Sequence, residues 1–176
     1  SLPPARLKGS AVGAPAAIAR VRGPVATLGL GAHVGGALGG AAWPVPGGVA
    51  LLALFMTLFG LAIGVAKDLP DVLGDRAHDV GNLTVRAGAR TALAATRALA
   101  LGAYAATAVG GVLVLPAAAA ATLGAGHGLV AAALWTRSRD VDVTDRTAVK
   151  RFYRGLWRLY YAECALLPAA LLLGGG

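Results

Sequence analysis

The chain has 176 residues, of which 57% are hydrophobic and only 14% are charged, whereas an average soluble domain has about 25% charged residues. This composition argues against an ordinary water-soluble domain and favours a protein embedded in a lipid bilayer. The net charge of +8 could suggest a nucleic-acid-binding protein. The basic residues form no patch interleaved with aromatic residues, however, so we predict no nucleic-acid partner.

Long uncharged stretches divide the chain. No Asp, Glu, Lys or Arg occurs in residues 23–66 or 98–136, and only Glu163 interrupts residues 159–176. A helix needs about 20 mostly apolar residues to cross a bilayer, so each of the first two stretches can hold two helices and the last can hold one. We therefore predict an all-α, polytopic membrane helix bundle with about five transmembrane helices. These helices are expected over residues 14–37, 49–67, 91–113, 117–136 and 149–173.

The basic residues are distributed unevenly along this chain. The 16 Lys and Arg residues lie in three blocks, residues 6–22, 67–97 and 137–158. With five helices, all three blocks fall on one side of the membrane, and the loops on the other side carry no charge. This is the positive-inside distribution, so we predict that the blocks face the cytosol or its organellar equivalent.

Three aspartates follow the second predicted helix, in the sequence KDLPDVLGDR of residues 67–76. Asp68, Asp71 and Asp75 stand at i, i+3 and i+7, so on a helix they would lie within an arc of about 60°. Such a face repels itself unless cations bind there, and carboxylates are hard oxygen ligands suited to Mg²⁺, which commonly bridges to substrate phosphates. The spacing therefore fits a magnesium diphosphate site. The alternative is a solvated loop that begins where the membrane ends.

Two further polar residues interrupt the apolar helices. Glu163 lies where an ionised side chain costs at least ~2.5 kcal/mol, so we predict that it faces the bundle interior, either in a structural hydrogen bond within YYAE or near a substrate. His127 is expected to be a hydrogen-bonded interior residue or a helix-packing contact. Gly31, Gly35 and Gly39 recur at a spacing of four, which predicts close helix packing at that face.

KDLPDVLGDR resembles the second aspartate-rich motif of the UbiA superfamily of intramembrane prenyltransferases, in the form carried by homogentisate prenyltransferases of plants, algae and cyanobacteria. Three other segments are similar to family landmarks and occur in family order: SLPPARLKGSAV, NLTVRAGAR and FYRGLWRLYYAECALLP. The resemblance implies a bundle of about nine helices in which two aspartate-rich motifs face a central cavity. The first motif has no counterpart here, so residues 1–176 are expected to be the C-terminal part of one such domain, without its N-terminal helices.

The resemblance also implies an activity. It implies a Mg²⁺-dependent enzyme that transfers a polyprenyl group from its diphosphate to homogentisate, whose carboxyl group is lost. Mapped onto this chain, the metal-binding and catalytic residues are Asp68, Asp71 and Asp75, and the substrate-binding residues are Arg6, Lys8, Lys67 and Arg76. Asp79 could extend the acidic face and His78 could contact a substrate, but their roles stay open.

The prenyl donor is less well indicated. Val21 to Gly23 and the segment TLFGLAIGVAKDLPDV are slightly more similar to solanesyltransferases of plastoquinone synthesis, whereas LWTRSRDVDV is more similar to phytyltransferases of tocopherol synthesis. The resemblance thus slightly favours a solanesyl donor, in a multi-pass protein of a plastid membrane with the aspartates on the stromal side. A truncated, non-catalytic membrane protein whose aspartates bind a structural ion is the alternative. A soluble helical terpene cyclase conflicts with the uncharged spans.

Overall fold

The computed structural model describes residues 13–40, 44–72 and 83–174, and these residues form helices and short connections without any strand. The predicted all-α class is therefore confirmed. In chain order the elements are α1 (Gly13–Arg20), the π-helical segment η2 (Val21–Leu28), α2 (Gly29–Ala37), α3 (Gly47–Ala66), the 3₁₀ turn η3 (Leu69–Asp71), α5 (Leu83–Ala87), α6 (Ala89–Val114), α7 (Ala117–Ser138) and α8 (Arg146–Gly174).

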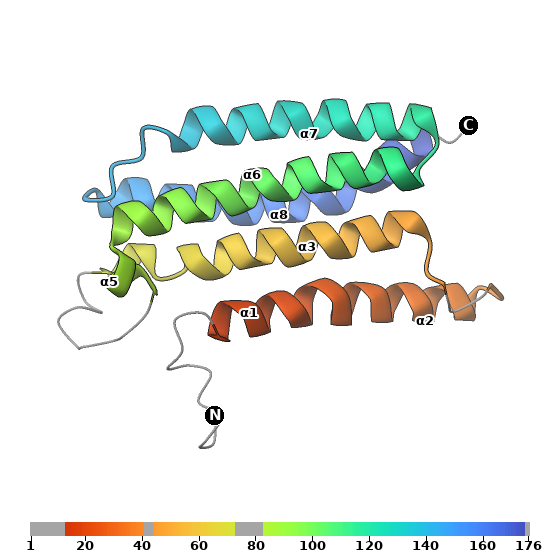
Figure 1. Ribbon diagram of the computed structural model, residues 1–176, viewed down its shortest axis with the longest axis horizontal. Coiled ribbons are helices and arrows are strands. Elements are labelled where there is room, and N and C mark those ends of the chain that lie inside the picture. Colours follow the sequence, from red (N-terminus) through yellow and green to blue (C-terminus); the bar gives the residue numbers. More distant parts are fainter. Residues whose placement is uncertain (1–12, 41–43, 73–82, 175–176) are drawn as a thin grey trace, which may run out of the picture.

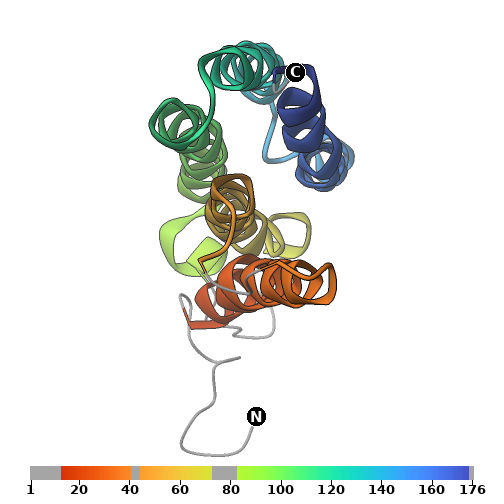
Figure 2. The same ribbon diagram turned by 90° about the vertical axis from the view of Figure 1, so that its right-hand side faces the viewer.

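Four long helices lie side by side and form the bundle (Figure 1). Viewed along their axes, α3, α6, α7 and α8 make a ring in which α3 contacts α6, α6 contacts α7, α7 contacts α8, and α8 contacts α3 (Figure 2). The segments α1 and η2 pack on α3 from outside this ring. The short turn η3, the start of α6, the end of α7 and the start of α8 all lie at one end (Figure 1). We call it the charged end because these elements and the residues beside them carry the described basic residues Lys67, Arg90, Arg137, Arg139 and Arg146.

Two prolines set the helix boundaries at the opposite end. Pro46 and Pro116 precede α3 and α7 with extended backbones, at ψ 145° and 147°. A proline disfavours helical geometry in the residue before it, so α6 stops at Val114 and Leu115 is extended, with φ −110° and ψ 156°. The connection between α6 and α7 therefore lies near Pro116, as the sequence predicts.

Within the described ranges, four helices are long and apolar enough to cross a membrane by length and composition, namely residues 47–71, 89–114, 117–138 and 146–174. They correspond to the last four predicted spans. The first predicted span is helical over residues 13–37, but η2 divides it, and Arg20 and Arg22 lie within it. Pro24 explains this division, because its ring clashes with the carbonyl one turn earlier in an α-helix. The wider π-helical turn relieves that clash.

Small residues allow α1 and η2 to approach α3 closely. A Cβ atom added to Gly64 would lie 2.8 Å from the Cβ of Pro15, and one added to Gly60 would lie 3.6 Å from the Cα of Ala19. Gly23 continues the same row at a spacing of four and is buried. Both sides of this interface thus use the small-xxx-small arrangement of membrane helices.

The predicted packing face at Gly31, Gly35 and Gly39 is only partly correct. Gly31 does approach α3, since a Cβ atom there would lie 2.5 Å from Cγ1 of Val49. Gly39 instead ends α2, with φ +77°, and the amide of Gly40 donates a hydrogen bond to the carbonyl of Gly35 over 3.0 Å. This is the Schellman geometry, which favours glycine at its left-handed position, so these glycines terminate a helix.

Candidate functional site

The first two predicted metal ligands lie in a single turn at the charged end. After α3 the chain passes through Lys67 into η3, where the amide of Asp71 donates a hydrogen bond to the carbonyl of Asp68 over 3.3 Å. Side chains at i and i+3 are eclipsed in a 3₁₀ turn, so the two carboxylates lie on the same side of the chain. Leu69 is only 3% exposed and anchors the turn in the core. We call this segment, residues 67–71, the aspartate turn.

The other predicted site residues divide into two groups. Lys67 lies in the aspartate turn, and its Nζ atom is 3.7 Å from Oδ1 of Asp68. The remaining predicted metal ligand, Asp75, and the predicted substrate-binding residues Arg6, Lys8 and Arg76 lie outside the described residues. Their roles stay predictions.

An arginine from α8 completes the surroundings of the aspartate turn. Nη2 of Arg146 donates a hydrogen bond to Oδ1 of Asp71 over 2.7 Å, and its Nε donates to the carbonyl of Pro70 over 3.1 Å. The arginine and aspartate side chains are 67% and 59% exposed, so the pair contributes at most about 1 kcal/mol to stability. Its main effect is to fix the orientation of Asp71. No sequence pattern indicates Arg146, because 75 residues separate it from Asp71.

The loop before α8 places Arg146 at the helix start. Oδ1 of Asp145 accepts a hydrogen bond from the amide of Thr147 over 2.8 Å, which is a side-chain cap of the helix. Asp142 accepts hydrogen bonds from the amide and the hydroxyl of Thr144, over 2.8 and 2.7 Å, and these bonds hold the pKa of Asp142 below its usual value. These two loop aspartates therefore serve the local backbone.

The aspartate turn offers oxygen ligands that suit a divalent cation. The side chains of Asp68 and Asp71 are 24% and 59% exposed, so both reach solvent. Two carboxylates, completed by water and by substrate phosphate oxygens, match the ligand preferences of Mg²⁺. No group of three His, Cys, Asp or Glu residues close enough to hold a metal occurs within the described part of the chain.

A second polar cluster lies midway along α7 and α8, away from the aspartate turn. Nε2 of His127 is 3.0 and 3.1 Å from the two carboxylate oxygens of Glu163, and its Nδ1 is 3.2 Å from the backbone carbonyl of Tyr104. Both polar side chains are about 1% exposed. The prediction that Glu163 faces the interior is confirmed. Its partner, however, is His127 on α7 and not a residue within YYAE.

The geometry of this cluster fixes how its protons are shared. A carbonyl oxygen can only accept a hydrogen bond, so Nδ1 of His127 carries a hydrogen and donates it to Tyr104. The contact with Glu163 then holds one further proton, which sits on either the imidazole or the carboxyl group. The pair is neutral overall in both cases. An apolar interior tolerates a neutral, hydrogen-bonded pair far better than a lone charge.

These features define a multi-pass α-helical membrane protein with an exposed pair of carboxylates and an arginine at its charged end. Residues 4–161 match the model of the UbiA prenyltransferase family, and the chain belongs to that family. The predicted family membership is therefore confirmed.

Several relatives carry related names. The chain is 36% identical over 173 residues to the homogentisate phytyltransferase of a Synechocystis strain, which covers 98% of this chain and 56% of the relative. It is 33% identical over 171 residues to the chloroplastic homogentisate solanesyltransferase of Arabidopsis thaliana, with 96% and 44% covered. It is 32% identical over 168 residues to the probable homogentisate phytyltransferase 1, chloroplastic, of Oryza sativa subsp. japonica, with 96% and 42% covered. The chain thus spans about half the length of these relatives. No solved structure matches it.

Proposed function

We propose that this chain belongs to a Mg²⁺-dependent membrane prenyltransferase that transfers a polyprenyl group from its diphosphate to homogentisate, with loss of the acceptor's carboxyl group. The observation that carries the proposal is the aspartate turn, in which two carboxylates lie on one side of the chain and one of them, Asp71, binds Arg146 at the charged end of a UbiA-family bundle. The names of the three relatives, all homogentisate prenyltransferases, support the same reaction.

The reaction sets clear demands on this site. The bond between the prenyl C1 and the diphosphate oxygen breaks, and a carbon–carbon bond forms to the acceptor ring, which loses a proton from that position. The carboxyl group leaves as CO₂, and the carbon that carried it gains a proton. Bound Mg²⁺ would supply Lewis-acid stabilisation of the leaving diphosphate. In our proposal, Asp68 and Asp71 hold the metal together with Asp75.

Cationic side chains complete the proposed diphosphate site. Lys67, Arg76 and Arg146 offset the negative charge that develops on the leaving group, which is most effective where water is excluded. Arg146 has five N–H donors, and among the described residues it uses two of them, on Asp71 and Pro70, so others can reach phosphate oxygens. Arg6 and Lys8 are assigned to the diphosphate or to the acceptor carboxylate. The apolar helices would shield an allylic cation from water.

The prenyl donor and the location are proposed from segment similarity and from the names of the relatives. We favour a solanesyl donor slightly over a phytyl donor, on the similarity of TLFGLAIGVAKDLPDV to solanesyltransferases. The names of the relatives include both donors at similar identity. Chloroplastic names among the relatives support a plastid membrane, with the aspartate turn on the stromal side. Residues 1–176 are proposed to be the C-terminal part of a single catalytic domain.

A transfer assay on membranes that contain the whole enzyme, of which residues 1–176 are the proposed C-terminal part, tests this proposal. Solanesyl and phytyl diphosphates are each supplied with homogentisate, with and without Mg²⁺, and the prenylated product is measured by mass spectrometry. We expect Mg²⁺-dependent product, reduced about 100-fold or more in Asp71→Asn. Asp140→Asn is the matched control, since Asp140 lies in an exposed loop and pairs with Arg139, and it should leave the rate unchanged.

The outcomes of this assay distinguish the proposed catalytic site from the non-catalytic alternative. Product that forms equally well without Mg²⁺, or in Asp71→Asn, would refute the proposed site. Absence of turnover, together with absence of any Mg²⁺-dependent binding of the diphosphates, would instead indicate the non-catalytic alternative, in which the aspartates bind a structural ion.

A further inference from the structure

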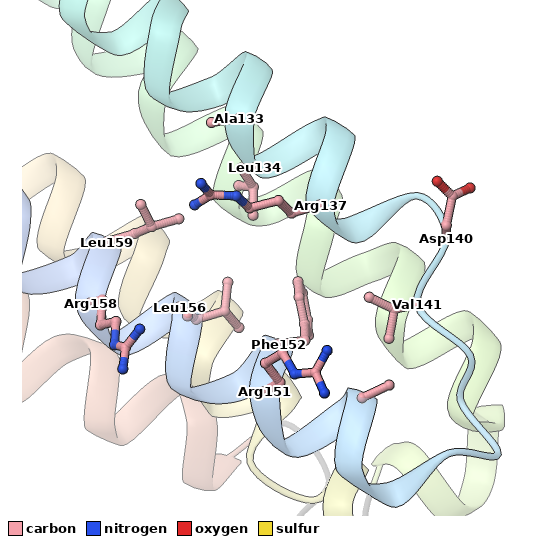
Figure 3. A pocket seen from close by; sticks show the side chains of 12 residues that line it. Ala133, Leu134, Arg137, Asp140, Val141, Arg151, Phe152, Leu156, Arg158 and Leu159 are labelled. Atoms are coloured by element: carbon pink, nitrogen blue, oxygen red, sulfur yellow. The ribbon is translucent and has the colours of Figure 1, made fainter.

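A groove between α7 and α8 belongs to no part of the proposed site. It has a volume of about 420 Å³ and lies near the charged end of the bundle (Figure 3). Apolar side chains form much of its wall, among them Leu134 from α7 and Phe152, Leu156 and Leu159 from α8. This apolar wall extends from the charged end along α7 and α8 into the part of each helix that crosses the membrane.

The same groove carries an excess of positive charge. Arg137, Arg151 and Arg158 line it, and none of them makes a hydrogen bond or ion pair with another described residue. Asp140 also lines the groove, but its carboxylate points away in Figure 3 and pairs with Nε of Arg139 over 3.1 Å. The three guanidinium groups therefore have no protein acceptor among the described residues.

The length of α8 places this charge at the surface of the bilayer. The helix has 29 residues, or ~43 Å at 1.5 Å per residue, whereas the hydrocarbon core is about 30 Å thick. The C-terminal half of α8 is apolar, so the excess of about nine residues projects from the charged end. Arg151 then lies at the level of the lipid headgroups, and Arg158 lies about two turns, or ~10 Å, deeper along the helix.

The groove also faces away from the helices that precede α3. At 100° per residue, Trp157 lies roughly opposite the groove-lining residues of α8. On that other side, the guanidinium group of Arg22 in η2 lies 4.7 Å from the ring centroid of Trp157. The groove is therefore on the face of α8 that is turned away from η2.

We propose that this groove is a binding site for an anionic phospholipid. Guanidinium groups bind phosphate oxygens in a bidentate manner, and basic pockets between membrane helices are suited to anionic headgroups. The lipid phosphate binds Arg137, Arg151 and Arg158, while one acyl chain lies along Leu159 and Ala133. A zwitterionic headgroup brings its own cation and would leave the groove's positive charge uncompensated.

Native mass spectrometry of the purified full chain tests this site. The protein, in detergent, is titrated with dioleoylphosphatidylglycerol or dioleoylphosphatidylcholine, and the retained lipid is counted. We expect one tightly retained phosphatidylglycerol, preferred about 10-fold over phosphatidylcholine. Arg158→Ala should reduce this preference about 10-fold, in line with the loss of one charge-assisted hydrogen bond. Arg154→Ala is the matched control, because Arg154 is exposed on the same helix but does not line the groove.

Three results would overturn the proposal. The first is the absence of any preference for phosphatidylglycerol in the unaltered chain. The second is an equal loss of preference in Arg154→Ala and Arg158→Ala, which would mean that the lipid senses only total charge. The third is displacement of phosphatidylglycerol by millimolar inorganic phosphate, which would identify a site for soluble anions. Retention of the lipid in that competition supports the assignment.

Discussion

The buried pair of His127 and Glu163 gives a sharp prediction about stability. Replacing Glu163 by leucine leaves Nε2 of His127 without a partner in an interior where it is about 1% exposed. Replacing His127 by leucine likewise leaves the carboxyl group of Glu163 buried and without a hydrogen-bond partner. Replacing both by leucine removes both polar groups at once. The three variants and the unaltered chain form a double-mutant cycle.

The expected magnitudes follow from the two close contacts, at 3.0 and 3.1 Å. A buried polar group that loses its partner costs ~1–3 kcal/mol, so each single variant should lose about 2–3 kcal/mol of unfolding free energy. Coupling energies in membrane proteins average ~0.6 kcal/mol and reach ~1.7 kcal/mol. We expect a value of about 1–2 kcal/mol here, because both groups are fully buried, and the double variant should therefore lose less than the sum of the single variants.

Reversible unfolding in mixed micelles by increasing mole fractions of dodecyl sulfate, followed by far-UV circular dichroism, measures these free energies. Glu163→Gln is the conservative control: its amide can donate a hydrogen bond to Nε2 while Nδ1 still donates to Tyr104, so its loss should stay below about 1 kcal/mol. Strict additivity of the two leucine substitutions would refute the reasoning. So would a Glu163→Gln variant as unstable as Glu163→Leu.

Three further predictions concern other parts of the chain. Arg146→Ala should weaken Mg²⁺-diphosphate binding about 10-fold by releasing Asp71, as measured by isothermal titration calorimetry, while the melting temperature stays within a few degrees. An unchanged affinity would show that the contact does not position Asp71. Asp145→Ala should cost about 1 kcal/mol through loss of the α8 cap, measured by chemical unfolding, and Asp145→Asn should restore most of it. Gly64→Leu should separate α1 from α3, because the new side chain would overlap Pro15. Limited proteolysis should then cleave the N-terminal helices faster than in the unaltered chain. Gly102→Leu is the control and should not increase cleavage, since nothing lies within 4 Å of a Cβ atom added there.

Local signals in the sequence predict much of this fold. The uncharged stretches predict four of the long helices, and Pro46 and Pro116 mark where two of them begin, because proline restricts its own backbone and that of its neighbour. The position of the two described aspartates on one side of the chain also follows from their spacing of three. In the structure, a 3₁₀ turn places the two aspartates on one side of the chain, because α3 stops at Ala66 and does not continue through them.

Contacts between distant residues could not be predicted in the same way. Arg146 meets Asp71 across 75 residues, and His127 meets Glu163 across 36. Neither pair follows a helical repeat, so only the packing of the bundle brings them together. The burial of Glu163 was predictable, because an ionised group in an apolar span must find a partner. The identity of that partner depends on how α7 and α8 lie against each other.

The contact between Arg146 and Asp71 has a consequence for the order in which the protein is made. The aspartates of η3 leave the ribosome 75 residues before the arginine that orients one of them. At about 5–20 residues per second, that interval lasts about 4–15 seconds. During it, α6 and α7 must enter the membrane before the start of α8 is available. The aspartate turn therefore reaches its final geometry only after α6 and α7 have been made and the start of α8 has followed them.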